Sequence, residues 1–181
     1  MKITLLPGDG IGVEIVDAAV EVLDAAAKKF GMTIEYDKQL IGCAAIDATG
    51  VPLPEATIAS AKTADAVLLG AVGGPKWDNV APEIRPEKGL LGIRKALGLY
   101  CNLRPIKVSR FVALKNERVS GTDLLIVREL TGGIYFGAKN EAAPDADGVE
   151  TASDVEIYTR PEVERIARFA FEAAKKRRGK V

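Results

Sequence analysis

The sequence predicts an α/β protein built around a parallel sheet, and three observations support that class. Residues 66–70 form a continuous apolar run between turn residues, which is typical of a strand buried in a parallel sheet. A long segment after residue 12 carries apolar residues at helical spacing. Strand and helix patterns then alternate, and a βαβαβ order implies parallel strands covered by helices.

The first strand and the first helix have clear sequence boundaries. Residues 2–6 are predicted to form a strand that ends at Pro7, and a Gly-rich turn follows at 8–12. The next helix is expected to stop at Gly31. Its buried stripe is predicted at Ile15, Ala19, Leu23, Ala26 and Phe30. A further strand and a short helix are predicted at residues 32–36 and 55–62.

The later elements follow from the same signals. The predicted order is a long loop at 71–85, a helix from Pro86 to about residue 97, and strands at 100–108 and 123–128. Two extended arms around a polar loop are expected at 132–137 and 149–158. A last helix opens at Pro161 and stops at Gly179, with a buried stripe at Val163, Ile166, Ala170 and Ala174.

The composition excludes several classes of partner. The 25 basic and 25 acidic residues cancel, so no overall field would hold the chain on nucleic acid or on a membrane. No segment approaches the roughly 20 apolar residues of a membrane helix. Cys43 and Cys101 show no metal-ligand spacing and are expected to be reduced in a cytoplasmic, soluble protein. Because the sequence has no histidine, any acid–base chemistry at neutral pH would have to use Tyr, Lys, Glu, Asp or a metal-bound water.

Two Gly-rich segments are candidates for ligand binding. The turn at 8–12 lies between strand and helix, like a dinucleotide fingerprint, but its glycines do not have the G-x-G-x-x-G spacing. It is therefore either a nucleotide-binding loop of another type or a tight turn that needs positive φ. The segment 73–78 follows the apolar run at 66–70, and ligands of open parallel sheets bind beyond the carboxyl ends of strands. A plain connecting loop is the alternative there.

One helical face combines apolar and charged side chains. Its four members, at offsets 0, 3, 4 and 7, are Glu87, Leu90, Leu91 and Arg94. Two leucines at this spacing are usual in a core, whereas a carboxylate and a guanidinium beside them do not suit a dry core. The face is either part of the core or a site for a small ligand with an apolar branch and an anionic end.

Three later residues have both a structural and a functional interpretation. Arg104 and Arg128 lie on predicted strands, where an arginine more often forms a salt bridge than binds a ligand. Together with a third arginine they would suit a dicarboxylate, because guanidinium binds carboxylate in a bidentate way. Tyr135 lies in a glycine-rich stretch that allows close backbone approach, and it is either a proton donor or a packed aromatic.

Taken together, these segments resemble the β-decarboxylating dehydrogenases, and within them the isopropylmalate branch. The resemblance runs through nearly the whole chain, and its most telling segments are 6–12, 69–77, 102–105, 127–137 and 164–168. The stretch 128–137 is the most specific. Isocitrate-type relatives carry an Asn-Thr-Glu-Asp run where this chain has Leu-Thr-Gly-Gly at 130–133.

The resemblance implies a non-Rossmann α/β fold of two domains. Residues 1–99 would form the amino-terminal part of the first domain, with the cofactor and substrate helix, and 100–181 would belong to the second. The implied reaction is the NAD-dependent oxidation and decarboxylation of 3-isopropylmalate in leucine biosynthesis. The family is homodimeric, and residues 137–158 would form an arm that pairs with the partner subunit.

The resemblance also implies roles for individual residues. Arg94, Arg104 and Arg128 match arginines that grip the malate carboxylates, and Tyr135 matches the catalytic tyrosine. Glu87, Leu90 and Leu91 match positions that recognise the isopropyl group and the nicotinamide side of the cofactor. The residues that match cofactor contacts are Ile11, Gly73, Gly74, Pro75, Lys76, Trp77, Asp78 and Pro86.

The chain departs from the family in length. Complete members are longer, and their general-base lysine and three aspartates that bind Mg²⁺ or Mn²⁺ lie beyond the matching part, so no metal ligand is assigned here. We expect an incomplete fold that is inactive by itself. Two alternatives stay open. One is another 2-hydroxy-acid decarboxylating dehydrogenase, acting on homoisocitrate or tartrate. The other is a non-catalytic fragment that needs a complementary chain.

Overall fold

The computed structural model describes residues 1–77, 79–108 and 119–181. The chain divides into two compact units, Met1–Gly98 and Leu99–Val181. This division lies one residue from the domain boundary expected after residue 99.

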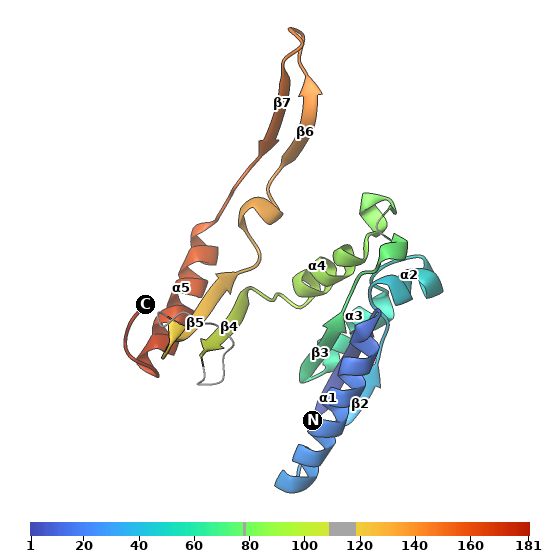
Figure 1. The fold of residues 1–181 in the computed structure, drawn as a ribbon, viewed down its shortest axis with the longest axis vertical. Coiled ribbons are helices and arrows are strands. Elements are labelled where there is room, and N and C mark those ends of the chain that lie inside the picture. Colours follow the sequence, from blue (N-terminus) through green and yellow to red (C-terminus); the bar gives the residue numbers. More distant parts are fainter. Residues whose placement is uncertain (78, 109–118) are drawn as a thin grey trace. The chain divides into compact units, whose positions relative to one another are not determined.

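The first unit is built on a three-stranded parallel sheet (Figure 1). Its strands are β1 (Lys2–Gly8), β2 (Glu35–Lys38) and β3 (Ala66–Ala71), in the order β2-β1-β3. The predicted parallel α/β arrangement is confirmed. The prediction that β1 ends at Pro7 is wrong. The register with β2 stops at Leu5 and the register with β3 skips Pro7, so the missing N–H removes no ladder bond there.

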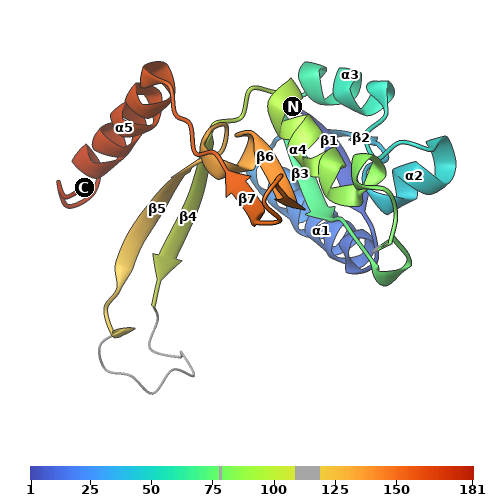
Figure 2. The same ribbon diagram turned by 90° about the horizontal axis from the view of Figure 1, so that it is seen from above.

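Strand β1 supplies one row of side chains to each face of this sheet. Ile3 and Leu5 pack with helix α1 (Ile11–Phe30), and Leu6 lies in a second apolar cluster on the other face. That second cluster also receives α3 (Glu55–Thr63) and α4 (Pro86–Ala96). Figure 2 shows α1 on one side of the strands and these two helices on the other. The central strand is therefore buried on both faces, as parallel sheets require.

The buried stripe of α1 differs from the predicted one. The residues that face the sheet are Val16, Val20, Leu23 and Ala27. Of the predicted stripe only Leu23 packs there, whereas Ile15 and Phe30 are 46% and 70% exposed. Ile15 and Val16 are both apolar, so periodicity could not choose between two stripes that differ by about 100° of helix rotation. Docking on the sheet decided it.

The rest of the first unit follows the predicted order with two differences. A short helix, α2 (Cys43–Thr49), was not predicted, and the loop after β3 contains single 3-10 turns at Pro75–Trp77 and Pro82–Ile84. The second strand begins at Glu35, three residues later than expected. In the described part of the chain, no helix combines the length and the apolar character needed to cross a membrane.

The described residues of the second unit form two antiparallel strand pairs and one α-helix. The first hairpin pairs β4 (Cys101–Lys107) with β5 (Asp123–Glu129), and the second pairs β6 (Lys139–Pro144) with β7 (Glu150–Asp154). Helix α5 (Arg160–Lys175) begins one residue before the expected position and ends before Gly179. Its predicted stripe is wrong at Val163, which is exposed, and right at Ala174, which is buried.

The expected extended arm at 132–137 is also wrong. Residues Gly133–Tyr135 form a 3-10 turn, and the strand of the arm starts at Lys139. Gly133 has φ +73°, a left-handed conformation that interrupts an extended chain at no cost for glycine.

Candidate active site

The Gly-rich turn after β1 is held by backbone contacts. A Cβ on Gly12 would lie 2.1 Å from the Pro7 carbonyl oxygen and 2.7 Å from the Ala71 nitrogen, so only glycine allows α1 to start against β3. This close approach accounts for the turn by packing alone. Ile11, the residue matched to the cofactor, is exposed beside it.

Asp9 in that turn is a residue that sequence reasoning missed. Its buried carboxylate accepts hydrogen bonds from the backbone N–H groups of Cys43 (2.8 Å), Ala44 (2.7 Å) and Gly73 (2.9 Å). It therefore ties the start of α2 to the start of the loop after β3. Burial, with the neighbouring Asp9 carboxylate, raises the pKa of the Cys43 thiol to about 11, so this thiol stays protonated at neutral pH.

The loop after β3 forms a pocket with the start of α4. The pocket has a volume of about 320 Å³ and is lined by Gly73, Gly74, Trp77, Arg85, Pro86 and Glu87. It lies at the carboxyl end of β3, where ligands of parallel sheets bind. Pro75 and Lys76 lie in the 3-10 turn beside it, and Asp78 lies outside the described residues.

The predicted face of α4 turns away from the core. Pro86, Gly89 and Ile93 are the buried residues of this helix, and Ile93 belongs to the apolar cluster with Leu6. The residues of the predicted face are partly buried at Leu90, Leu91 and Arg94 and exposed at Glu87. Neither leucine is part of the cluster around Leu6.

Two of the predicted arginines share one face of the β4–β5 hairpin. The register places Arg128 opposite Asn102, and Arg104 lies two residues further along the same strand as Asn102. Successive strand residues point to opposite faces, so Arg104 and Arg128 lie on the same face. The Nε of Arg104 donates to the Asn102 side-chain oxygen at 2.7 Å. This face therefore presents two guanidinium groups, which suits a carboxylate ligand.

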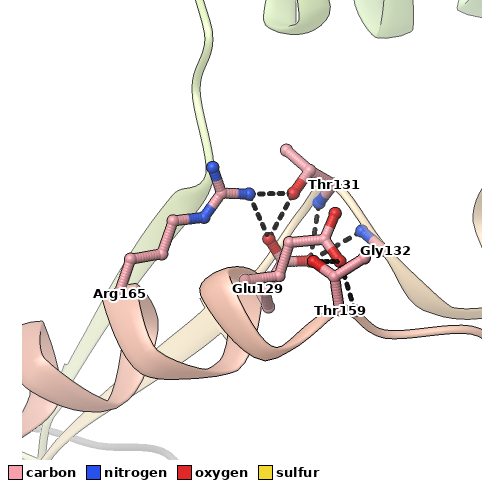
Figure 3. Close-up of polar contacts among 6 residues, drawn as sticks. Glu129, Thr131, Gly132, Thr159 and Arg165 are labelled. Atoms are coloured by element: carbon pink, nitrogen blue, oxygen red, sulfur yellow. Dashed lines mark hydrogen bonds and ion pairs between the residues drawn. The ribbon is translucent and has the colours of Figure 1, made fainter.

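The opposite face of the hairpin packs toward α5 and carries an ion pair. Glu129 accepts hydrogen bonds from the N–H groups of Thr131 (2.6 Å) and Gly132 (2.8 Å) and from Arg165 of α5 at 3.2 Å (Figure 3). Arg165 also donates to the Thr131 hydroxyl, and its guanidinium carbon lies 4.7 Å from the centre of the Tyr100 ring. No sequence motif singled out Glu129 as functional.

The turn that carries Tyr135 is placed by two of its glycines. A Cβ on Gly132 would lie 2.8 Å from the Tyr158 ring, and a Cβ on Gly137 would lie 1.6 Å from the Val155 carbonyl oxygen. The predicted close backbone approach is confirmed, and the surface approached is the chain's own segment 155–158. The N–H of Gly133 also donates to the Ile157 carbonyl at 2.9 Å.

The candidate residues thus form two groups, one in each unit. The loop pocket and the α4 face belong to Met1–Gly98, and the two arginines and the Tyr135 turn belong to Leu99–Val181. Among the described residues, no three His, Cys, Asp or Glu side chains gather closely enough to hold a metal ion, so these residues do not fit a metal site of their own.

The chain thus combines a parallel α/β unit that has a pocket at the end of β3 with a second unit whose β4–β5 pair carries two arginines on one face. The chain belongs to the isocitrate/isopropylmalate dehydrogenase family, whose model matches residues 2–181. Its own sequence therefore carries the family's amino-terminal part, as the resemblance predicted.

Curated relatives narrow this likeness to one branch of the family. The 3-isopropylmalate dehydrogenase of Bacillus licheniformis is 54% identical over 99% of this chain, and that of Bacillus subtilis is 50% identical over 99%. In both cases the match covers 50% of the relative. The chain spans about half the length of the curated relatives it matches.

Solved structures agree with this placement. The isocitrate dehydrogenase of Methylococcus capsulatus is similar with a TM-score of 0.79 and 35% identity, covering 99% of this chain and 49% of the other. A β-decarboxylating dehydrogenase from Thermococcus kodakarensis has a TM-score of 0.68 and 36% identity, covering 97% of this chain and 46% of the other. The fold is therefore that of this family, represented in part.

Proposed function

We propose that these residues supply the substrate site and part of the cofactor site of a cytoplasmic, NAD-dependent 3-isopropylmalate dehydrogenase. The reaction would oxidise and decarboxylate 3-isopropylmalate in leucine biosynthesis. The observation that carries the proposal is the α4 face, where Leu90 and Leu91 stay outside the core cluster and lie between Glu87 and Arg94. Relatives that carry this enzyme's name are 50% to 54% identical to the chain.

Each part of the substrate has a matching group in the chain. Arg104 and Arg128 share a face on which a carboxylate can be bound in a bidentate way, and Arg94 is the third proposed carboxylate ligand. Leu90 and Leu91 would contact the isopropyl branch, where an apolar surface favours an alkyl group over water. Tyr135 is proposed to hold and transfer a proton during the reaction.

The pocket beside α4 fits the nicotinamide end of the cofactor. Trp77 and Pro86 give it an apolar wall, Arg85 and Glu87 line its charged part, and its 320 Å³ suits a portion of a dinucleotide. NAD, when bound, supplies the hydride acceptor. The chain's own task there is to orient the cofactor toward the α4 face and to exclude water. Asp9 supports this loop through Gly73.

The ligands of Mg²⁺ or Mn²⁺, and the lysine base, are proposed to come from outside these residues. Oxygen ligands are expected, since both ions prefer carboxylates.

The partner is proposed to be a second copy of the enzyme, bound through the arm at about 137–158, or a complementary chain that completes the fold. Every residue of β6 and β7 is exposed, and a lone two-stranded hairpin is marginally stable in water. Pairing with another chain would satisfy its free edges.

Substrate choice tests the proposal. In a full-length enzyme that carries these residues, replacing Leu90 and Leu91 with alanine removes apolar contact at about 0.8 kcal/mol per CH₂. The preference for isopropylmalate over malate, measured as the ratio of kcat/KM values, should fall by about tenfold or more. Homoisocitrate and tartrate are the competing substrates to include.

The matched control is Leu97→Ala at the end of the same helix. Leu97 packs against the core cluster, so this change should lower thermal stability and leave the ratio of kcat/KM values unchanged. An unchanged ratio in the Leu90 and Leu91 variant would show that these leucines only pack. A wild-type preference for homoisocitrate or tartrate would reject the proposed substrate.

A further inference from the structure

The Glu129 carboxylate is surrounded by donors on the face of β5 that packs toward α5. It accepts the N–H groups of Thr131 and Gly132, the Thr131 hydroxyl, and a guanidinium N–H of Arg165 (Figure 3). Only 11% of its side chain is exposed. The donors come from two different segments of the chain, the loop after β5 and helix α5. One carboxylate therefore joins the strand, the loop and the helix.

Arg165 is itself held in a defined orientation. It stacks on the Tyr100 ring and donates to both Glu129 and the Thr131 hydroxyl. The start of α5 is fixed by a capping box, in which Glu162 accepts the N–H (2.7 Å) and the hydroxyl (2.8 Å) of Thr159. Arg165 lies on this helix one turn after its start. Helix α5 thus presents the guanidinium to Glu129 from a rigid base.

The position of this pair in the strand has a consequence for the proposed site. Glu129 follows Arg128 directly, and adjacent strand residues point to opposite faces. Pulling Glu129 onto α5 therefore turns Arg128 to the face that also carries Arg104. In the carboxyl-terminal direction, Glu129 holds the loop at Thr131, and Tyr135 follows four residues later. Arg128 and the Tyr135 turn are therefore both connected through the backbone to the segment that Glu129 holds in place.

A stabilising salt bridge alone does not account for this arrangement. Ion pairs that lose water gain little net stability, because desolvation offsets the attraction. The Nε of Arg165 is buried and makes no hydrogen bond to the described residues, so the guanidinium orientation does not maximise its own bonding. In this orientation the guanidinium instead donates hydrogen bonds to both Glu129 and Thr131.

We propose that Glu129 and Arg165 are positioning residues, which set the direction of Arg128 and the location of the Tyr135 turn. This inference rests on the proposed function and concerns the same site. Neither residue needs to touch the substrate. Their effect would pass through the backbone of residues 128–135, where misplacement of about 1 Å costs up to about 100-fold in rate.

The test uses a full-length enzyme that carries these residues, with Glu129→Gln and Arg165→Met. Both variants should lower kcat/KM for isopropylmalate by about tenfold or more and raise its KM, while KM for NAD changes by less than about twofold. Arg165→Lys, which keeps the charge but loses the planar fork, should fall between wild type and Arg165→Met.

The matched control is Glu172→Ala. Glu172 lies on the exposed surface of the same helix and pairs with Lys175, so its loss should leave both KM values within about twofold of wild type. Hydrogen exchange at the Thr131 and Gly132 amides gives a readout independent of activity, and it should speed up in Glu129→Gln but not in the control.

The outcomes separate this inference from the function on which it rests. If wild-type enzyme does not turn over isopropylmalate, the proposed function fails, and amide exchange still tests the clamp. If wild type is active and Glu129→Gln keeps its kinetics and its amide protection, the positioning role is overturned. A loss of kinetics in Glu172→Ala equal to that in Glu129→Gln would also overturn it, because a general disturbance of α5 would then explain both.

Discussion

At the scale of single residues, one acidic side chain in each unit holds the loops beside the candidate residues of that unit. Asp9 binds three backbone N–H groups from α2 and the loop after β3, and Glu129 binds two from the loop after β5. Both lie in segments that carry the family resemblance, but neither was assigned a role from the sequence, because an isolated carboxylate next to a glycine-rich stretch has no periodic signal. Each carboxylate gives backbone N–H groups a charge-assisted hydrogen bond where no helix or strand partner is present. The chain thereby holds irregular loops in defined conformations.

The environment of Glu129 lowers its pKa, and we therefore expect the stability of the fold to depend on pH. Burial raises its pKa, but the hydrogen bonds from Thr131, Gly132 and Arg165 together lower it more, so the pKa lies below its ordinary 4.5. A carboxyl group with a lowered pKa stabilises the folded state above its unfolded pKa, and the contribution is lost as pH falls through the folded pKa. The melting temperature of Glu129→Gln should therefore be below wild type at about pH 7, and the gap should narrow when the pH is lowered to about 3.

Thermal unfolding at both pH values measures this difference. Glu164→Gln is the control, because Glu164 pairs with Arg160 on the exposed surface of α5 and surface pairs contribute little. A gap between wild type and Glu129→Gln that is equally large at both pH values would contradict the ionic origin of the effect.

At the scale of elements, the sheet determines which side chains its helices bury. The alternation of β1 sends Ile3 and Leu5 to α1 and Leu6 to the opposite cluster. Helix α1 meets this surface with Val16 and Leu23, and α4 meets it with Ile93. The remaining faces of both helices are then left for solvent or for ligands. The Leu90 and Leu91 face of α4 is such a face.

The two candidate buried stripes of α1 make opposite predictions about which alanine substitution lowers the free energy of unfolding more. Val16 is 2% exposed, so Val16→Ala should cost about 2 kcal/mol from the lost methyl groups and the cavity that remains. Ile15→Ala, on the exposed side of the same turn, should change stability by less than about 0.5 kcal/mol. Denaturant unfolding followed by fluorescence of Trp77, the only tryptophan, reports on this unit. A larger loss of stability in Ile15→Ala than in Val16→Ala would instead show that the stripe predicted from periodicity is the buried one.

At the scale of the whole molecule, the chain presents two units with much apolar surface still exposed. Phe30 on α1 and Ile126 on β5 are examples, with 70% and 44% of their surfaces accessible. Every residue of strands β6 and β7 is exposed, and the two strands extend as a hairpin within the second unit (Figure 1). Surfaces of this kind usually mark contacts with further protein. They agree with the proposal that the site is completed by other chain segments.

The proposed arm predicts a change of oligomeric state. In a full-length enzyme that carries these residues, replacing 141–152 with an Asn-Gly turn removes most of β6 and β7 while keeping a hairpin geometry. The dimer should then dissociate to monomers, as measured by light scattering after gel filtration. Glu141→Gln, a single change on the exposed arm, should leave the mass unchanged. A dimeric shortened variant would show that the arm does not hold the partner.

The sequence by itself determined the α/β class, the order of most elements and the family. These follow from signals local in the chain, such as apolar runs, helical spacing and glycines at turns, and from the specific stretch at 128–137. Only the tertiary structure decided that Val16 rather than Ile15 is buried, and that residues 133–135 turn rather than extend. It also revealed the tasks of Asp9 and Glu129. Burial and hydrogen bonding depend on partners that are distant in sequence, as Asp9 and Gly73 are, so no local pattern can show them.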